Sequence, residues 1–198
     1  MNRRTLYVLS LSLIALFAGE IRAQAVPLPD ESIQVTFHVL SASPEAAAKK
    51  TPPALAGVVR QLSQSFGIEG VGVSETFFGM IGRRGSVEYK SVSNASFQGM
   101  PAMPGFLDWK VRGAEPVRTA DGAEAFVINS VSFGMRVPVR INSNPEGAGQ
   151  GVVNYEWTGI SLDRTTIRDG VPTLVGTLSL PNSTGKMYLV LTLSSVRN

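Results

Sequence analysis

The chain has 198 residues with 18 Lys and Arg, 15 Asp and Glu, a single histidine and no cysteine. A chain without cysteine has no disulfide bond, no thiolate nucleophile and no cysteine metal ligand. Most of the basic excess lies in the first 25 residues, and the remainder carries 15 basic and 14 acidic residues. A net charge near +1 provides no field that would attract a polyanion, which argues against nucleic acid as a partner.

The first 25 residues have the pattern of a cleaved signal peptide. A basic head with Arg3 and Arg4 precedes an apolar run over residues 6–18, and Ala23-Gln24-Ala25 places small residues at a cleavage site. The apolar run is too short to span about 30 Å of hydrocarbon, which argues against a membrane anchor. We expect cleavage after Ala25, with cleavage after Ala23 as the alternative. The mature protein is then exported and periplasmic or extracellular, without an integral membrane span, and its association with the outer membrane is left open.

The next segments predict a strand followed by a helix. Apolar and polar residues alternate over residues 33–39, which predicts a strand with one buried face and places His38 on the opposite face. Residues 51–67 predict a helix with Thr51 as its N-cap and Gly67 at its end. Its apolar residues recur at helical spacing, and we expect Leu62 and Phe66 to face a sheet.

Two further strands complete an N-terminal strand-helix-strand-strand unit over residues 26–92. Residues 71–81 and 86–92 predict the strands, and residues 82–85 between them predict a hairpin-type turn with Arg83 and Arg84 at its tip. Residues 93–104 contain one glycine and two prolines, which predicts a loop or linker.

The remaining residues, 105–198, predict an antiparallel β region. Strand patterns occupy residues 106–111, 123–141, 152–162, 173–180 and 187–196, with a tight turn at Asp169-Gly170 and a final hairpin across residues 181–185. We predict an α+β fold, mostly β, in which the N-terminal unit is followed by an antiparallel sheet or a sandwich-like region. The two segments form either one domain or two.

No catalytic constellation stands out. A Ser-His-Asp triad needs a positioned base, and the chain has one histidine and no G-x-S-x-G motif. Its carboxylates are scattered singly, whereas glycosidases need a facing pair and transition-metal sites need clustered ligands. We therefore expect no enzyme activity, no metal and no cofactor.

A few candidates remain for contacts with a partner or ligand, namely Arg83, Arg84, Trp109 and Trp157. The two arginines at a turn can meet carboxylates of a partner. Tyr155 and Trp157 alternate within one strand, and this spacing favours core positions over an exposed platform that would stack on a sugar.

Residues 165–196 resemble the end of the bacterial secretin β-module. The match rests on Asp169-Gly170, on Val175-Gly176 and on the apolar strand over residues 189–193. The N-terminal strand-helix-strand-strand order is similar to that of the small ring-building domains that precede secretin barrels. The resemblance implies a location in the bacterial envelope and a role in protein interaction.

Two hypotheses for function follow. The first is an exported bacterial envelope protein, secretin-related and non-enzymatic, that binds another protein or assembles with itself. The alternative is a β-module that binds a small ligand or a carbohydrate. They differ in whether Trp109, Tyr155 and Trp157 line an open groove or fill the core.

Overall fold

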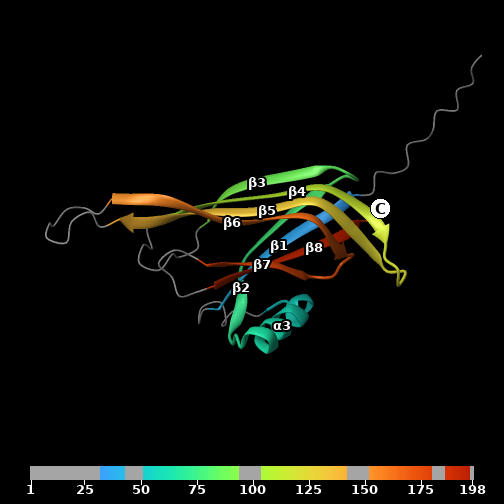
Figure 1. Ribbon diagram of the computed structural model, residues 1–198, viewed down its shortest axis with the longest axis horizontal. Coiled ribbons are helices and arrows are strands. Elements are labelled where there is room, and N and C mark those ends of the chain that lie inside the picture. The colour runs from blue at the N-terminus through green and yellow to red at the C-terminus, as the bar shows by residue number, and fades with distance from the viewer. Residues whose placement is uncertain (1–31, 43–50, 94–103, 142–151, 180–185, 197–198) are drawn as a thin grey trace, which may run out of the picture. The chain divides into compact units, whose positions relative to one another are not determined.

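The computed structural model describes residues 32–42, 51–93, 104–141, 152–179 and 186–196. The predicted signal peptide, residues 43–50 and most of the predicted linker lie outside these residues. The elements follow each other along the chain as β1 (Ser32–Ala42), η1 (Pro53–Leu55), α3 (Ala56–Phe66), β2 (Val71–Ile81), β3 (Ser86–Ser93), β4 (Gly105–Arg118), β5 (Glu124–Ile141), β6 (Val152–Arg168), β7 (Thr173–Ser179) and β8 (Lys186–Val196) (Figure 1). The predicted α+β, mostly β class is confirmed. Neither of the described helices is long and apolar enough to cross a membrane.

The strands form two antiparallel sheets of four strands each. The first sheet has the order β2-β1-β8-β7, and the second has the order β3-β4-β5-β6. The C-terminal strand β8 lies between β1 and β7, so residues 26–92 and 105–198 both contribute to each sheet. Glu31–Asn198 form one compact unit.

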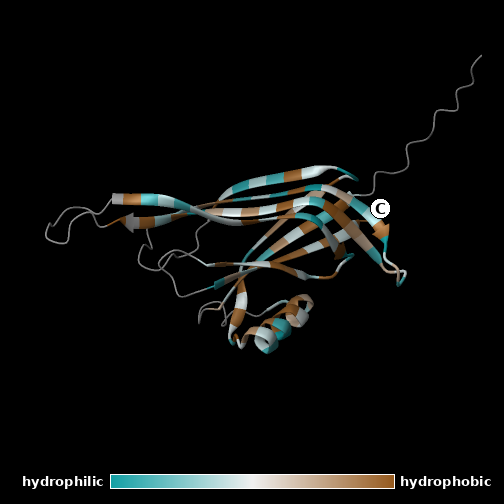
Figure 2. Ribbon diagram, viewed as in Figure 1, coloured by the Kyte–Doolittle hydropathy of each residue, from teal (hydrophilic) through white to brown (hydrophobic). Residues whose placement is uncertain are grey.

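The two sheets face each other across one hydrophobic core. Strands alternate in hydropathy along their length (Figure 2), because successive side chains point to opposite faces of a sheet. In β1 the residues Ile33, Val35, Phe37 and Val39 are buried, as the sequence predicts. Phe37 packs against Trp109 of the second sheet with ring centroids 5.0 Å apart. Tilted aromatic pairs of this kind stabilise the packing of two sheets beyond the free energy of burying their apolar surface.

Strand β8 is covered on both faces. Met187, Leu189, Leu191 and Leu193 point into the core between the sheets, and Val190 packs in a second cluster on the other face. The strand pairing of the predicted C-terminal hairpin is confirmed, because β7 pairs antiparallel with β8, and its predicted turn over residues 181–185 lies outside the described residues. The Asp169-Gly170 turn is also present. The carboxylate of Asp169 accepts two hydrogen bonds from Ser195, one from its backbone N–H at 3.0 Å and one from its side-chain hydroxyl at 2.8 Å.

Helix α3 covers part of the outer face of the first sheet. Leu55, Val58 and Leu62 are buried in the same cluster as Val190, which confirms that Leu62 faces a sheet. The helix ends at Gly67, whose φ of 63° is the left-handed conformation that glycine tolerates best.

Two details of the helix prediction are wrong. Phe66 is 60% exposed although it continues the buried stripe four residues after Leu62, because it is the last residue of the helix. Thr51 does not cap the helix. Pro52 and Pro53 begin a short 3-10 turn there, and no side chain makes a cap hydrogen bond at its start.

Residues 82–85 carry the chain from one sheet to the other and do not form the predicted hairpin. Strand β2 pairs with β1 in the first sheet, whereas β3 pairs with β4 in the second. The crossing is held to β4 by the N–H of Arg84, which donates to the carbonyl of Ala114 at 3.1 Å, and by the N–H of Gly113, which donates to the carbonyl of Gly85 at 2.8 Å.

Two glycines allow the sheets to approach each other at their sides. A Cβ on Gly79 of β2 would lie 3.0 Å from Val87 and 3.1 Å from Trp109. On the other side, a Cβ on Gly176 of β7 would lie 2.6 Å from Ile160 of β6. Larger residues here would push the two sheets apart, because packed interiors have no spare volume.

Candidate functional site

The outer face of the second sheet carries an exposed row of mainly apolar residues. Because the inward-facing residues of β4 and β5 fill the core, their alternate residues point outward. The strand register then aligns Val92 of β3 with Phe106 of β4, Phe106 with Arg136 of β5, and Arg136 with Trp157 of β6. These four residues therefore form one line across all four strands, and we call them the transverse row.

The side chains of this row are open to solvent. Trp157 is 60% exposed, Val92 is 50% exposed and Phe106 is 46% exposed. Tyr155 extends the apolar surface, because its ring packs against Phe106 with centroids 5.4 Å apart and its hydroxyl donates to the carbonyl of Pro104 at 3.3 Å. Exposed large apolar side chains gathered in one place are a usual mark of an interaction site.

A groove of about 630 Å³ runs along the transverse row. This volume falls within the range of roughly 300–1,000 Å³ that is typical of ligand sites. The groove is lined by Lys90, Ser91, Val92, Phe106, Leu107, Asp108, Arg136 and Trp157.

The indole of Trp157 lies across two glycines that face each other on neighbouring strands. Gly134 of β5 pairs with Gly159 of β6. A Cβ on Gly134 would lie 2.7 Å from Nε1 of Trp157, and a Cβ on Gly159 would lie 2.5 Å from Cζ2 of the same ring. The missing side chains thus leave a seat for one face of the indole, and its high exposure leaves ring surface free to meet a ligand.

Charged residues surround the row but differ in whether they are paired. Glu88 contacts Lys90 at 3.0 Å and Lys110 at 2.5 Å. The hydrogen bond from Lys110, followed by that from Lys90, lowers the pKa of Glu88 to about 2. Arg136 makes no ion pair or hydrogen bond with any residue that the structure describes. Within the part of the chain that the structure describes, the guanidinium of this row therefore has no ionic partner.

The two tryptophans that were predicted as contact residues differ in their exposure to solvent. Trp157 lies in the groove, and its exposure means that the core position favoured by its spacing is wrong. Trp109 is fully buried and stacks on Tyr89 with ring centroids 5.6 Å apart, so it is not a surface contact and that expectation is corrected. The pattern of a single sequence does not show which of two tryptophan-containing strands places its tryptophan in the core.

The two arginines lie at the crossing between the sheets, away from the groove residues. Arg84 adopts a left-handed backbone with φ of 60°, and its Nε forms an ion pair with the carboxylate of Glu115. Both partners of this pair are well exposed, so its contribution to stability is small. Arg83 is exposed.

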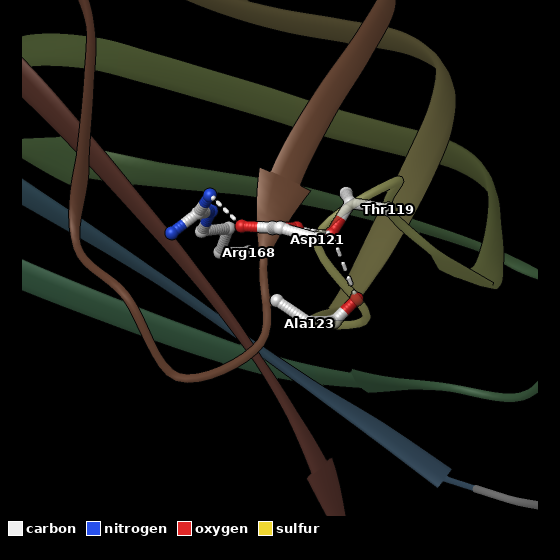
Figure 3. A network of polar contacts seen from close by, with 4 residues as sticks. All are labelled: Thr119, Asp121, Ala123 and Arg168. Carbon is white, nitrogen blue, oxygen red and sulfur yellow. Dashed lines mark hydrogen bonds and ion pairs between the residues drawn. The ribbon is translucent and has the colours of Figure 1, made fainter.

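Two further polar clusters share no residue with the groove. His38 lies on the outer face of β1, its Nδ1 is 2.9 Å from the hydroxyl of Thr76, and burial lowers its pKa. At the turn between β4 and β5, Arg168 donates to Asp121 at 2.6 Å, and the hydroxyl of Thr119 lies 3.0 Å from the carbonyl of Ala123 (Figure 3).

Hydrogen bonding from Thr119 is the main cause that lowers the pKa of Asp121 in this turn. The cluster closes a surface turn. Across the described part of the chain, no group of three or more His, Cys, Asp or Glu residues is placed to hold a metal ion.

Comparisons with known proteins find similarity to secretin structures. No family model matches the sequence, and no curated protein matches it. The type II secretin GspD from enteropathogenic Escherichia coli is 8% identical with a TM-score of 0.39, and the alignment covers 96% of this chain and 74% of that one. The type IV competence pilus secretin PilQ of V. cholerae is 9% identical with a TM-score of 0.40, covering 94% of this chain and 66% of that one.

A third similar structure is the Klebsiella pneumoniae type II secretion system outer membrane complex of PulD, PulS and the PulC HR domain. It is 9% identical with a TM-score of 0.41, and the alignment covers 96% of this chain and 43% of that chain. The chain therefore resembles secretins weakly over its length, and this level of similarity does not assign it to a family.

Proposed function

We propose that this chain is an exported, non-enzymatic protein of the bacterial envelope that binds a protein partner, or another copy of itself, through the outer face of its second sheet. Export is supported by the basic, apolar and small-residue pattern of residues 1–25. A binding role is supported by the transverse row, because it combines exposed apolar rings with a guanidinium that has no ion pair among the described residues, beside a groove.

The observation that carries the proposal is the exposure of Trp157 on the groove. Trp, Tyr and Arg are the residues that most often dominate binding energy in protein interfaces, and they do so where they cluster centrally. Here Trp157 and Arg136 are neighbours in the row, and Tyr155 lies against Phe106. An exposed indole costs free energy in water, and burying it against a partner recovers that cost.

Site-specific photo-cross-linking in the native host tests the proposal. A photoreactive amino acid at Val92 lies within the row, and one at Val171 has comparable exposure on the β6–β7 connection. We expect an adduct of discrete mass from position 92, none from position 171, and loss of the adduct when Trp157→Ala is added. Adduct mass separates a second copy of this chain from a different protein. Equal adducts at both positions, or an adduct that survives Trp157→Ala, would contradict the proposal.

A carbohydrate ligand is the second candidate, and the seat of Trp157 on Gly134 and Gly159 favours it. A flat, exposed indole is suited to stack on the apolar face of a sugar ring. Because Trp109 is buried, a change of intrinsic fluorescence on adding oligosaccharides would report Trp157. If a saccharide changes the fluorescence of the wild type but not that of Trp157→Phe, the result would favour a carbohydrate ligand over a protein partner.

A further inference from the structure

The position of Arg136 within the transverse row distinguishes it from the other cations of the same face. Its cross-strand neighbours are Phe106 on one side and Trp157 on the other, so no carboxylate stands directly beside it. Adjacent strands lie about 4.8 Å apart, which places both aromatic residues next to the base of the arginine side chain.

The two lysines of this face, in contrast, share one carboxylate. Lys90 and Lys110 both contact Glu88. Asp108 lies opposite Lys90 in the row next to the transverse row, and it forms no ion pair with Arg136. Among the described residues that line the groove, Lys90 therefore has a carboxylate contact, whereas Arg136 has none.

An unpaired guanidinium between aromatic rings is a site for an anion attached to an apolar group. The planar fork of arginine matches a carboxylate with two parallel hydrogen bonds, and the flanking rings exclude water from one side of that pair. A bare anion would leave Phe106 and Trp157 uncovered, whereas a purely apolar ligand would leave the guanidinium desolvated without a partner.

We infer that the partner presents an acidic residue to Arg136 together with an aromatic or aliphatic side chain that packs on Trp157. This inference rests on the proposed function and names the chemistry of the segment that the groove accepts. The segment is a short acidic-apolar stretch of a polypeptide, since the groove volume of about 630 Å³ accommodates a few side chains.

The chain offers a matched control for Arg136. Arg112 lies on the same outer face of the second sheet and is also exposed, but it aligns with Ser86 and Ser130 instead of aromatic residues. It is separated from the transverse row by six residues of β4, or roughly 20 Å at about 3.4 Å per residue. Replacing either arginine by glutamine removes the same charge from an exposed position.

Selection of random twelve-residue peptides on the purified protein tests the inference. On the wild type and on Arg112→Gln, we expect enriched peptides to carry Asp or Glu within three residues of an aromatic or aliphatic residue. On Arg136→Gln the acidic preference should disappear. A selected peptide should bind Arg136→Gln roughly 10- to 100-fold more weakly than the wild type, as expected for hydrogen bonds to a charged group.

A peptide in which Gln replaces the acidic residue supplies the second arm. It should lose the same factor on the wild type and little more on Arg136→Gln, since the two changes remove one shared interaction. The inference would be overturned if the peptides selected on the wild-type protein showed no preference for acidic residues. It would also be overturned if a selected peptide bound Arg136→Gln as tightly as the wild type. If binding is then still lost in Trp157→Ala, the proposed binding surface stands. Peptide binding that survives Trp157→Ala, or no enriched peptide, would overturn both.

Discussion

Replacing Leu62 by alanine should destabilise the protein without touching the groove. Leu62 is fully buried between helix α3 and the first sheet, in the cluster that contains Leu40 and Val190. The change removes three carbon atoms, which corresponds to about 2.4 kcal/mol of transfer free energy at roughly 0.8 kcal/mol per methylene. The cavity left behind adds to this loss, so we expect the free energy of unfolding to fall by about 2–5 kcal/mol.

Thermal and urea unfolding followed by circular dichroism measure the effect. For a domain of this size, about 2–4 °C of melting temperature are lost per kcal/mol, so the midpoint should fall by roughly 4–20 °C. Phe66→Ala is the control in the same helix, because its ring is exposed, and it should change stability by less than about 0.5 kcal/mol. A Leu62→Ala midpoint equal to that of the wild type, or an equal loss in Phe66→Ala, would refute the packing of the helix described above.

Three further outcomes are expected. Gly134→Ala places a Cβ 2.7 Å from Nε1 of Trp157, so it should displace the exposed indole, red-shift its fluorescence and leave the melting temperature within about 4 °C of the wild type. Deleting residues 187–198 should give insoluble protein, because a central strand covered on both faces is lost; a soluble truncation with a cooperative melt would contradict this. Lys110→Met should raise the pKa of Glu88 from about 2 toward 4.5 in a carboxyl NMR titration. In the wild type the ion pairs of Glu88 contribute stability that is fully present above pH 4.5 and is lost as the pH falls to about 2, and most of this pH dependence should be absent in Lys110→Met.

The local hydrophobic pattern was sufficient to predict β1, the end of helix α3 and β8. Alternation over residues 33–39 predicted the buried face of β1, and the apolar residues of residues 187–196 predicted a strand covered on both sides. Gly67 marked the helix end because only its backbone preference matters there. These predictions depend on neighbours within a few residues, and such neighbours are visible in a single sequence.

Pairing between distant strands was not predictable in the same way. The turn signals at residues 82–85 are those of a hairpin, yet the following strand joins the other sheet, where β4 supplies its hydrogen bonds. Trp109 and Trp157 have similar strand surroundings, and only the packing of two sheets decides that the first is buried and the second exposed.

The candidate site depends on register, which explains why most of it was missed. Trp157 was among the predicted contacts, but Val92, Phe106 and Arg136 were not. The four residues of the transverse row come from four different strands, and their alignment into one row follows from the pairing register. An exposed arginine opposite a tryptophan has no signature in a linear sequence.

The most direct test of the central claim is an NMR shift map of the labelled protein with its bound partner or selected peptide. If the outer face of the second sheet is the binding surface, the largest changes should fall on Val92, Phe106, Arg136 and Trp157, and helix α3 should remain unchanged. Changes concentrated on helix α3 or on the outer face of the first sheet, with the transverse row unaffected, would contradict the account.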